Sequence, residues 1–290
     1  MTKLNRREFL RKTLGGVGTL ALGAAGTDIL AEQKTLYADD RIILGPSDVE
    51  VSRLAIGTGT SGFGGSSEQT RDLGISGLAD LLRHGYENGI TFWDSADAYG
   101  SHPHLNEALD YVPREEVQIL TKTHASSARE MKADLDRFRK ELGTDYIDIL
   151  LLHMMRDEDW DQQKQGAMEV IAKAKQDGIV STHGVSCHTL RALKTAARSD
   201  WVEVDLARIN PFGIRMDADT ETVASVLEEM KRNGKGVIGM KLLGDGRLVH
   251  RIDESLRYSL THDFVDCFTI GIEAKEELDD LIERIPKVTA

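Results

Sequence analysis

Short apolar runs alternate with longer amphipathic segments from about residue 40 to the end of the chain. Apolar runs bounded by turn residues are typical of buried strands, and apolar positions spaced three and four apart indicate helices. We therefore expect a small hairpin from residues 41–44 and 49–54, followed by eight strands and eight helices. The expected strands cover residues 55–56, 91–94, 117–122, 147–153, 182–186, 204–210, 236–241 and 267–270. The expected helices cover residues 75–88, 105–109, 128–142, 162–177, 190–198, 221–233, 253–261 and 275–285.

The strict alternation of strands and helices predicts right-handed βαβ units and a parallel sheet. Eight such units in about 250 residues are typical of a single closed (β/α)8 TIM barrel, which we place at residues 40–290, with the hairpin at its N-terminus. An open dinucleotide-binding sheet would place a Gly-x-Gly-x-x-Gly turn between its first strand and a helix. Residues 57–62 hold glycines at that spacing, but no helix is expected directly after them, so we favour the barrel.

The composition is that of an ordinary globular α/β chain. The 290 residues are 40% hydrophobic and 29% charged, and 48 Asp and Glu outnumber 36 Lys and Arg. This balance excludes a disordered chain, and it gives no support for binding nucleic acid, which normally requires a basic face. The two cysteines, Cys187 and Cys267, are too few for a disulfide scaffold or an iron–sulfur cluster.

Residues 1–31 have the pattern of a targeting segment and are set apart from the fold. The sequence Asn5-Arg6-Arg7-Glu8-Phe9-Leu10-Arg11-Lys12 resembles the twin-arginine export motif, and residues 13–27 carry no charge. That uncharged stretch is shorter than the roughly 20 residues of a membrane span, so we expect no stable membrane anchor. We expect the twin-arginine export machinery to carry the folded protein to the periplasm. If this signal is not used, the protein stays in the cytoplasm.

Polar residues end several expected strands, on the side of a barrel where active sites lie. Asp94, Lys122 and His153 end the second, third and fourth strands, and Tyr99 closely follows Asp94. Each alone has an ordinary structural alternative, such as a helix cap, a packed ring or a satisfied core histidine. A lysine that ends an apolar strand needs a partner, however, and Asp94 on the neighbouring strand can supply it. Together the four residues predict a catalytic site.

The same residues carry a resemblance to a known family. The segments Asp94-Ser95-Ala96-Asp97-Ala98-Tyr99-Gly100, Leu120-Thr121-Lys122-Thr123 and Tyr146-Ile147-Asp148-Ile149-Leu150-Leu151-Leu152-His153, in this order, resemble the aldo-keto reductase family. The resemblance extends over nearly the whole chain after the targeting segment. It implies a barrel that binds a nicotinamide dinucleotide without a Rossmann motif. It also implies hydride transfer between that cofactor and a small carbonyl or polyol substrate, which could be an aldehyde, a ketone or a sugar.

By this resemblance, Tyr99 is the general acid that protonates the carbonyl oxygen, or the base in the reverse reaction. A free tyrosine has a pKa of about 10 and is a reluctant acid–base group at neutral pH. We expect Lys122 to lower the pKa of Tyr99, and Asp94 to hold Lys122 charged and oriented. His153 would orient the carbonyl oxygen and stabilise its developing negative charge.

The resemblance also assigns cofactor-binding positions, some of which depart from the family pattern. Ser186 matches a residue that binds the nicotinamide carboxamide, whereas Cys187 stands where asparagine is usual. Met240 replaces the aromatic side chain that stacks on the nicotinamide, and its thioether can still pack on the ring. Lys241 replaces a serine and could contact the pyrophosphate or pair with a neighbouring acid. The other expected cofactor-binding residues are Gly57, Thr58, Leu243, Gly244, Gly271, Glu273 and Glu277.

The last of these residues bear on the choice between NADH and NADPH. Residues 270–278 align with the family segment that holds the adenosine phosphate, where NADPH-using members place Lys or Arg. Here Glu277 falls where the arginine is expected, with Glu273 nearby. An acid near the ribose suits a free 2′-hydroxyl, so we expect NADH to be favoured. Lys275 leaves NADPH open.

Two other functions also stay open. One is a cofactor-binding regulatory or sensor barrel without significant turnover, although a silent site has no need for all four expected catalytic residues. The other is a metal-dependent barrel hydrolase, which normally has a His-x-His pair on its first strand. Here His102 and His104 follow the second strand, and we expect no metal. We expect these two histidines to shape a polar substrate pocket, with Trp160 as one of its walls.

Overall fold

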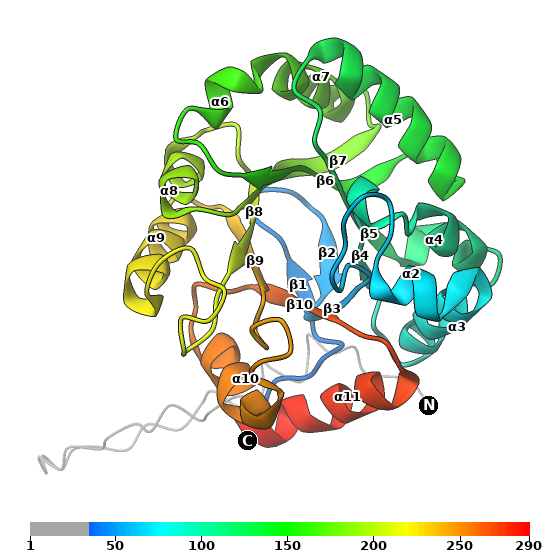
Figure 1. Cartoon of the computed structure of the whole chain (residues 1–290), viewed down its shortest axis with the longest axis vertical. Helices are drawn as coiled ribbons and strands as arrows, with labels where there is room; N and C mark the ends of the chain where they lie inside the picture. The colour runs from blue at the N-terminus through cyan, green and yellow to red at the C-terminus, as the bar shows by residue number, and fades with distance from the viewer. Residues whose placement is uncertain (1–34) are drawn as a thin grey trace, which may run out of the picture. The chain divides into compact units, whose positions relative to one another are not determined.

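Eight parallel strands close on themselves in the order β10-β3-β4-β5-β6-β7-β8-β9, and helices surround them (Figure 1). The computed structural model describes residues 35–290. The barrel strands are β3 (Leu54–Gly57), β4 (Phe92–Asp94), β5 (Gln118–Thr123), β6 (Ile147–Met155), β7 (Val180–Cys187), β8 (Val204–Arg208), β9 (Gly236–Met240) and β10 (Cys267–Gly271). The barrel predicted from the sequence pattern is confirmed.

The helices lie on the outside of the barrel, where they bury their apolar faces against the strands (Figure 1). They are α2 (Glu68–Asp72), α3 (Gly74–Glu87), α4 (His102–Leu109), α5 (Ala128–Leu142), α6 (Trp160–Gln163), α7 (Gln165–Gln176), α8 (Leu190–Arg198), α9 (Thr220–Arg232), α10 (Ile252–Thr261) and α11 (Lys275–Thr289). Three 3₁₀ turns are η1 (Asp97–Tyr99), η2 (Arg114–Glu116) and η3 (Val249–Arg251). The polar five-residue helix α2 has no apolar stripe, and the sequence pattern did not predict it.

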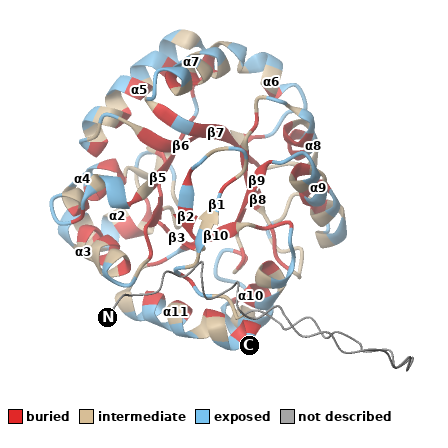
Figure 2. Ribbon diagram, turned by 180° about the vertical axis from the view of Figure 1, so that it is seen from behind, coloured by how far each residue is buried: buried red, intermediate tan, exposed pale blue. Residues whose placement is uncertain are grey.

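Two apolar layers hold the barrel together. One fills its interior with alternate strand residues, including Phe92, Leu120, Leu151 and Leu206, and the other lies between the strands and the helices. Figure 2 shows the buried residues, in red, along the strands and on parts of the surrounding helices. Because strand side chains alternate between the two layers, the parity of a residue at a strand end tells which layer it joins.

The expected hairpin is also present, as β1 (Arg41–Ile43) and β2 (Glu50–Ser52), which pair antiparallel. Leu44, Val49 and Val51 belong to the interior apolar cluster, so the hairpin packs against one end of the barrel. Its turn lies close to the start of β9, because a Cβ on Gly45 would lie 2.7 Å from the Gly236 nitrogen. The opposite end, where the strands finish, is left for polar residues. We call this end the mouth.

The targeting segment expected at residues 1–31 lies outside the described residues. Among residues 35–290, no helix is both long and apolar enough to span a bilayer.

Candidate active site

Lys122 ends the interior face of β5 and is almost completely buried, with 1% of its side chain exposed. Its ammonium donates to a carboxylate oxygen of Asp94, to the Ser95 carbonyl at 2.8 Å and to the Tyr99 hydroxyl at 3.4 Å. The second carboxylate oxygen of Asp94 accepts a hydrogen bond of 2.9 Å from Thr269. The buried ion pair is therefore hydrogen-bonded on both sides, which is the condition under which such a pair is tolerated. The partnership expected between Asp94 and Lys122 is present.

The pKa values of Lys122 and Tyr99 respond to this arrangement in different ways. Burial lowers the pKa of Lys122, but the charges of Asp94 and Tyr99 outweigh it, so the pKa stands above its ordinary value. Burial raises the pKa of the Tyr99 phenol, and the opposing charge of Lys122 does not cancel that rise. We expected Lys122 to bring the pKa of Tyr99 down. The net shift of the Tyr99 pKa is upward, because burial destabilises the phenolate by more than the Lys122 ammonium stabilises it. Tyr99 is therefore a proton-holding acid at neutral pH.

A glycine loop fixes the Tyr99 ring. A Cβ on Gly59 would lie 2.3 Å from one edge of the ring, and a Cβ on Gly62 would lie 2.4 Å from the other. Any larger residue at these positions would displace the ring. The glycine-spaced segment 57–62, discounted as a phosphate-binding turn, thus has a different use: it packs around the expected catalytic tyrosine.

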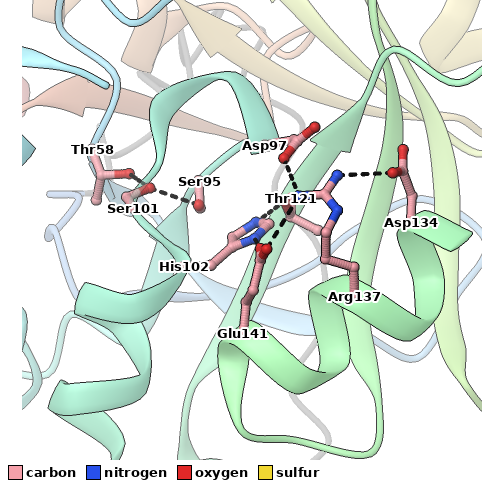
Figure 3. Close-up of polar contacts among 9 residues, drawn as sticks. All are labelled: Thr58, Ser95, Asp97, Ser101, His102, Thr121, Asp134, Arg137 and Glu141. Carbon is pink, nitrogen blue, oxygen red and sulfur yellow. Dashed lines mark hydrogen bonds and ion pairs between the residues drawn. The ribbon is translucent and has the colours of Figure 1, made fainter. Parts of the chain in front are cut away.

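A polar network holds the turn η1 that carries Tyr99 (Figure 3). Arg137 of α5 donates to Asp97 at 2.6 Å, to Asp134 at 2.8 Å and to Glu141 at 3.2 Å. Asp97 is the first residue of η1, so the arginine connects the tyrosine's turn to a full helix. Charge-assisted hydrogen bonds of this kind restrict the backbone that positions a reacting group.

The histidines expected to line a substrate pocket are buried. Both ring nitrogens of His102 are occupied, one by Glu141 at 2.8 Å and the other by Thr121 at 2.7 Å (Figure 3). His104 is 7% exposed. The prediction of a pocket was wrong because α4 begins at His102 and directs both rings into protein rather than into the mouth. Among residues 35–290, no three His, Cys, Asp or Glu side chains are arranged to hold a metal ion.

His153 reaches the mouth from β6 beside Tyr99. The two rings meet edge to face with centroids 5.7 Å apart, and His124 stacks on the other side of His153 at 4.7 Å. Burial, together with the charge of Lys122, lowers the pKa of His153 to about 2, so its imidazole is neutral. Its buried Nδ1 has no hydrogen-bond partner within residues 35–290. A neutral imidazole can donate one hydrogen bond, which is what a carbonyl oxygen requires.

The expected carboxamide-binding pair at the end of β7 divides into two different environments. The Ser186 hydroxyl accepts a hydrogen bond of 2.9 Å from the Met154 N–H and keeps its own proton to donate. Cys187 has the opposite parity: its side chain is fully buried in the layer between strands and helices. Burial raises the pKa of the Cys187 thiol, and Asp205 of β8 adds to that rise. This placement gives no support for a Cys187 contact with a cofactor.

The segment after β9 gives mixed results for the expected pyrophosphate site. Met240 faces the barrel interior, as a floor under the nicotinamide would require. Lys241, with a φ of 59°, pairs with Asp245 at 2.7 Å, which is the ion-pair alternative left open above. Gly244 has a φ of 57°, and a Cβ there would lie 2.9 Å from Ile214, so the loop needs glycine at this point. Leu243 is partly buried against the outer apolar layer.

The remaining expected cofactor positions lie at the ends of β3 and β10. Gly57 and Gly271 pair across the two strands, and a Cβ on Gly271 would lie 2.3 Å from Thr60. The Thr58 hydroxyl is buried and donates to the Asp94 carbonyl at 2.9 Å. It also lies 2.8 Å from the Ser101 hydroxyl, to which it is hydrogen-bonded (Figure 3). Thr58 is one of the expected cofactor-binding residues, but its hydroxyl is used in hydrogen bonds within the protein.

Two acids lie at the start of α11. Glu277 accepts a hydrogen bond of 2.8 Å from the Glu273 N–H, as a residue of the first turn of a helix commonly does. Burial raises the pKa of the Glu273 carboxyl. Lys275, the residue that left NADPH open, pairs with Asp80 of α3 at 2.5 Å.

Trp160 is not a wall of the mouth. It is 1% exposed, and its indole N–H donates to the Ala192 carbonyl of α8 at 3.2 Å. The prediction was wrong because the loop after β6 forms a short helix, α6, that packs the ring between helices.

Sequence reasoning missed one charged residue of the mouth. Arg208 ends β8 and has the same parity as Leu206 of the interior cluster. The expected strand was drawn through residue 210, which placed Arg208 inside it rather than at its end. A charged residue in an otherwise apolar strand was the available signal.

A family comparison now adds to this geometry. The aldo/keto reductase family model matches residues 55–287. The chain belongs to this family. The match contains all but the first residue of the barrel strands and extends into α11. Its members are oxidoreductases, so the resemblance noted from the sequence is confirmed at the level of the family.

Two curated relatives and one solved structure show how far the likeness extends. This aldo-keto reductase is 33% identical over 125 residues to probable aldo-keto reductase 1 of Glycine max, covering 38% of this chain and 35% of that protein. It is 23% identical over 201 residues to D-threo-aldose 1-dehydrogenase of a Pseudomonas species, covering 58% and 60%. The chain thus spans less than two thirds of either relative.

Aldo-keto reductase AKR11C1 of Bacillus halodurans shares the fold, with a TM-score of 0.66 and 18% identity over 87% of this chain and 96% of that one.

Proposed function

We propose that this aldo-keto reductase transfers hydride between a nicotinamide dinucleotide and a small carbonyl or alcohol, such as an aldehyde, a ketone or a sugar. The observation that carries the proposal is the Tyr99 hydroxyl, 3.4 Å from the Lys122 ammonium, with the His153 ring edge-on beside it. A carbonyl oxygen placed between Tyr99 and His153 can take a proton from the first and a hydrogen bond from the second.

The residues of the chain supply everything in this reaction except the hydride, which is the chemistry the cofactor brings when it is bound. Tyr99 holds the proton to be given to the carbonyl oxygen. Lys122 stabilises the phenolate left behind, and Asp94 keeps Lys122 charged. His153, neutral at physiological pH, orients the oxygen without competing for the proton. In the reverse direction the Tyr99 phenolate accepts the proton of an alcohol.

The mouth offers suitable groups for a dinucleotide. The free proton of the Ser186 hydroxyl suits the carboxamide oxygen, and the interior side chain of Met240 suits the nicotinamide face. At Gly244 and Gly271 a Cβ would clash with Ile214 and Thr60, so these glycines let the loops at the mouth pack closely together. Lys241 is one-third exposed, and its bond to Asp245 is at the surface, so it can turn to a phosphate.

We infer a preference for NADH over NADPH from the start of α11. Glu273 and Glu277 are carboxylates where a 2′-phosphate would need cations, and Lys275 is already engaged by Asp80. A phosphate placed there would meet like charge, whereas a ribose hydroxyl could donate to an acid.

Export of the folded protein with its cofactor already bound also belongs to this proposal. The export itself is proposed from residues 5–12. The cofactor would have to be bound before export, because no free nicotinamide pool is expected outside the cytoplasm. Slow release of dinucleotide from the purified protein is the expected behaviour. A protein isolated empty, with micromolar or weaker affinity, would contradict loading before export.

The test is a titration of the purified protein with NADH and NADPH separately, read by nicotinamide fluorescence. Addition of methylglyoxal, glyceraldehyde and a series of aldoses follows, read by nicotinamide absorbance. We expect tighter binding of NADH, and oxidation of NADH by at least one carbonyl. Binding of neither dinucleotide would overturn the proposal. Binding without turnover of any carbonyl would favour the regulatory barrel.

A further inference from the structure

Arg208 is a cation in the mouth whose acidic partner, Asp217, pairs with it only loosely, at 3.5 Å. It ends β8 opposite Met240 of β9, and its parity with Val204 and Leu206 directs its side chain to the barrel interior. Only 18% of the side chain is exposed. An arginine in such a place stays charged, because the guanidinium does not lose its proton in proteins.

Within residues 35–290, the N–H donors of the Arg208 guanidinium have few close acceptors. Nη1 donates to the Arg215 carbonyl at 3.2 Å, and the nearest carboxylate oxygen, on Asp217, lies 3.5 Å away, beyond a normal hydrogen bond. The buried Nε of Arg208 has no partner, and neither has the buried Oδ1 of Asp217. A buried guanidinium of this kind costs free energy unless an anion binds it.

The other cations nearby differ from Arg208. Lys122 is engaged by Asp94, and both Lys241 and Arg215 are engaged by Asp245. The charges of Arg208, Lys241, Arg156 and Lys122 reinforce the effect of burial and lower the pKa of His188 to about 3.

Arg208 is also connected to the reacting centre. It ends β8 on the interior face of the barrel, as His153 does close to the end of β6 and Lys122 close to the end of β5. His153 lies beside Tyr99. A substrate whose carbonyl oxygen contacts Tyr99 could therefore extend across the mouth toward the guanidinium.

From this geometry we propose that Arg208 binds a carboxylate of the substrate, so that the preferred substrate is a carbonyl compound that is also an acid: an oxo acid or a sugar acid. The proposal rests on the proposed function and narrows its substrate class. Arginine presents two parallel N–H groups to a carboxylate, and its Nε is the unpartnered donor here.

The phosphates of the cofactor are the other source of an anion. We favour the substrate because Arg208 shares the interior face of the barrel with Lys122 and His153. The expected pyrophosphate contact, Lys241, lies beyond the end of β9. The experiment separates the two sources.

The experiment compares matched substrates with and without a carboxylate: glyoxylate against glycolaldehyde, and glucuronate against glucose. In the wild type we expect the acid to have the higher kcat/KM in at least one pair. In Arg208→Met we expect kcat/KM for that acid to fall about 100-fold, with less than about a threefold change for its uncharged partner. Arg208→Lys should retain part of the preference, and Arg215→Met, at a neighbouring exposed arginine, should leave it unchanged.

Three results would overturn the proposal. If the wild type prefers neither acid over its uncharged partner, the proposed recognition of a substrate carboxylate is refuted, and the proposed carbonyl reduction still stands. An equal fall for both members of each pair, with a raised Kd for NADH, assigns Arg208 to the cofactor. A preference that survives in Arg208→Met, in protein shown to be folded by circular dichroism, removes Arg208 from recognition.

Direct binding covers the case of a protein with no turnover at all. Calorimetry with gluconate and with uncharged glucitol needs no reaction, and we expect gluconate to bind more tightly in the wild type and to lose that advantage in Arg208→Met. Equal binding of the two would contradict the anion site. Tighter gluconate binding without turnover would instead refute the proposed reaction and leave the anion site standing.

Discussion

Buried charged groups on the two sides of the mouth differ in how completely they are hydrogen-bonded. On the side of β4 to β6, the Lys122 ammonium has three hydrogen-bond partners and Asp94 has both oxygens engaged. On the side of β7 to β9, the Nε of Arg208 has no hydrogen-bond partner among the described residues, and neither has the Oδ1 of Asp217, 3.5 Å from the guanidinium.

The difference separates two tasks. A group that takes part in proton transfer works best when its surroundings are already oriented before the substrate arrives, as on the β4–β6 side. A group that recognises a ligand must keep donors or acceptors free for it, as Arg208 does. Asp217, the acid that faces Arg208, fits this contrast: burial raises its pKa to about 6, so it is a weak counter-ion for the guanidinium.

The largest effect is expected at the centre of the oriented side. Removal of the Tyr99 hydroxyl in Tyr99→Phe should lower kcat by roughly 10³-fold, within the range by which a general acid accelerates a reaction. The Kd for NADH should stay within about threefold of wild type. Steady-state rates and a fluorescence titration measure the two quantities. A variant with kcat near wild type would remove Tyr99 from the reaction.

Stability gives the sharpest contrast between the two cations. Lys122→Met leaves the buried Asp94 carboxylate without its charge partner, which should cost about 3–5 kcal/mol of unfolding free energy. Arg208→Met also leaves a buried acid, Asp217, without its cation, but that ion pair is longer, at 3.5 Å, so the loss of unfolding free energy should be smaller than for Lys122→Met. Urea unfolding measures both, with the double variant Asp94→Asn/Lys122→Met as the control expected to regain much of the loss. Equal destabilisation by the two single variants would contradict the comparison.

The next largest effect is expected from a substitution in the glycine loop around Tyr99. In Gly59→Ala the added methyl would overlap the Tyr99 ring, and a displacement of about 1 Å of a catalytic group can cost about 10² in rate. Gly64→Ala is the matched control, because it lies in the same loop and its Cβ would meet open space. Both variants should bind NADH normally. The account fails if kcat drops equally in the two.

The raised pKa of Tyr99 predicts opposite pH profiles for the two directions. Carbonyl reduction needs the phenol, so its rate should be flat through neutral pH and fall only as pH rises through the raised pKa. Alcohol oxidation needs the phenolate, so its rate should rise about tenfold per pH unit below that pKa. Rates measured from pH 6 to pH 10 in both directions test this. An oxidation rate independent of pH would contradict it.

The smallest effect concerns the cofactor end of the mouth. Glu273→Gln removes one negative charge near the expected ribose and should raise the affinity for NADPH relative to NADH by about threefold to tenfold. Glu276→Gln, an exposed carboxylate at the same helix start, is the control and should change the ratio less. Titrations with the two dinucleotides give the ratio. An equal change in both variants would show only a general effect of net charge.

Sequence periodicity was sufficient for the barrel, because buried parallel strands and amphipathic helices leave strong patterns. It also placed Asp94, Lys122 and His153 at one end of the barrel, since each lies at or close to the carboxyl end of its strand. It missed α2, which is short and polar, and it misplaced Trp160, His102 and His104. The direction of a loop side chain depends on tertiary packing, which no local pattern encodes.

The fine structure of the site was beyond sequence reasoning for a related reason. The upward pKa shift of Tyr99 comes from the balance between burial and one ammonium, and that balance requires distances. The roles of Gly59 and Gly62 depend on a ring that is far from them in the sequence. Thr58 and Cys187 were assigned from a family motif, and their parity and hydrogen bonds place them in protein packing instead.

The central claim is that Tyr99 gives the proton during carbonyl reduction. The most direct test mixes the NADH complex rapidly with a carbonyl substrate, follows a single turnover by nicotinamide absorbance, and repeats it in deuterated water. The account predicts slower turnover in deuterated water for the wild type, and for Tyr99→Phe a rate about 10³-fold lower with NADH binding intact. A Tyr99→Phe enzyme that turns over at the wild-type rate, with the same solvent isotope effect, would contradict it.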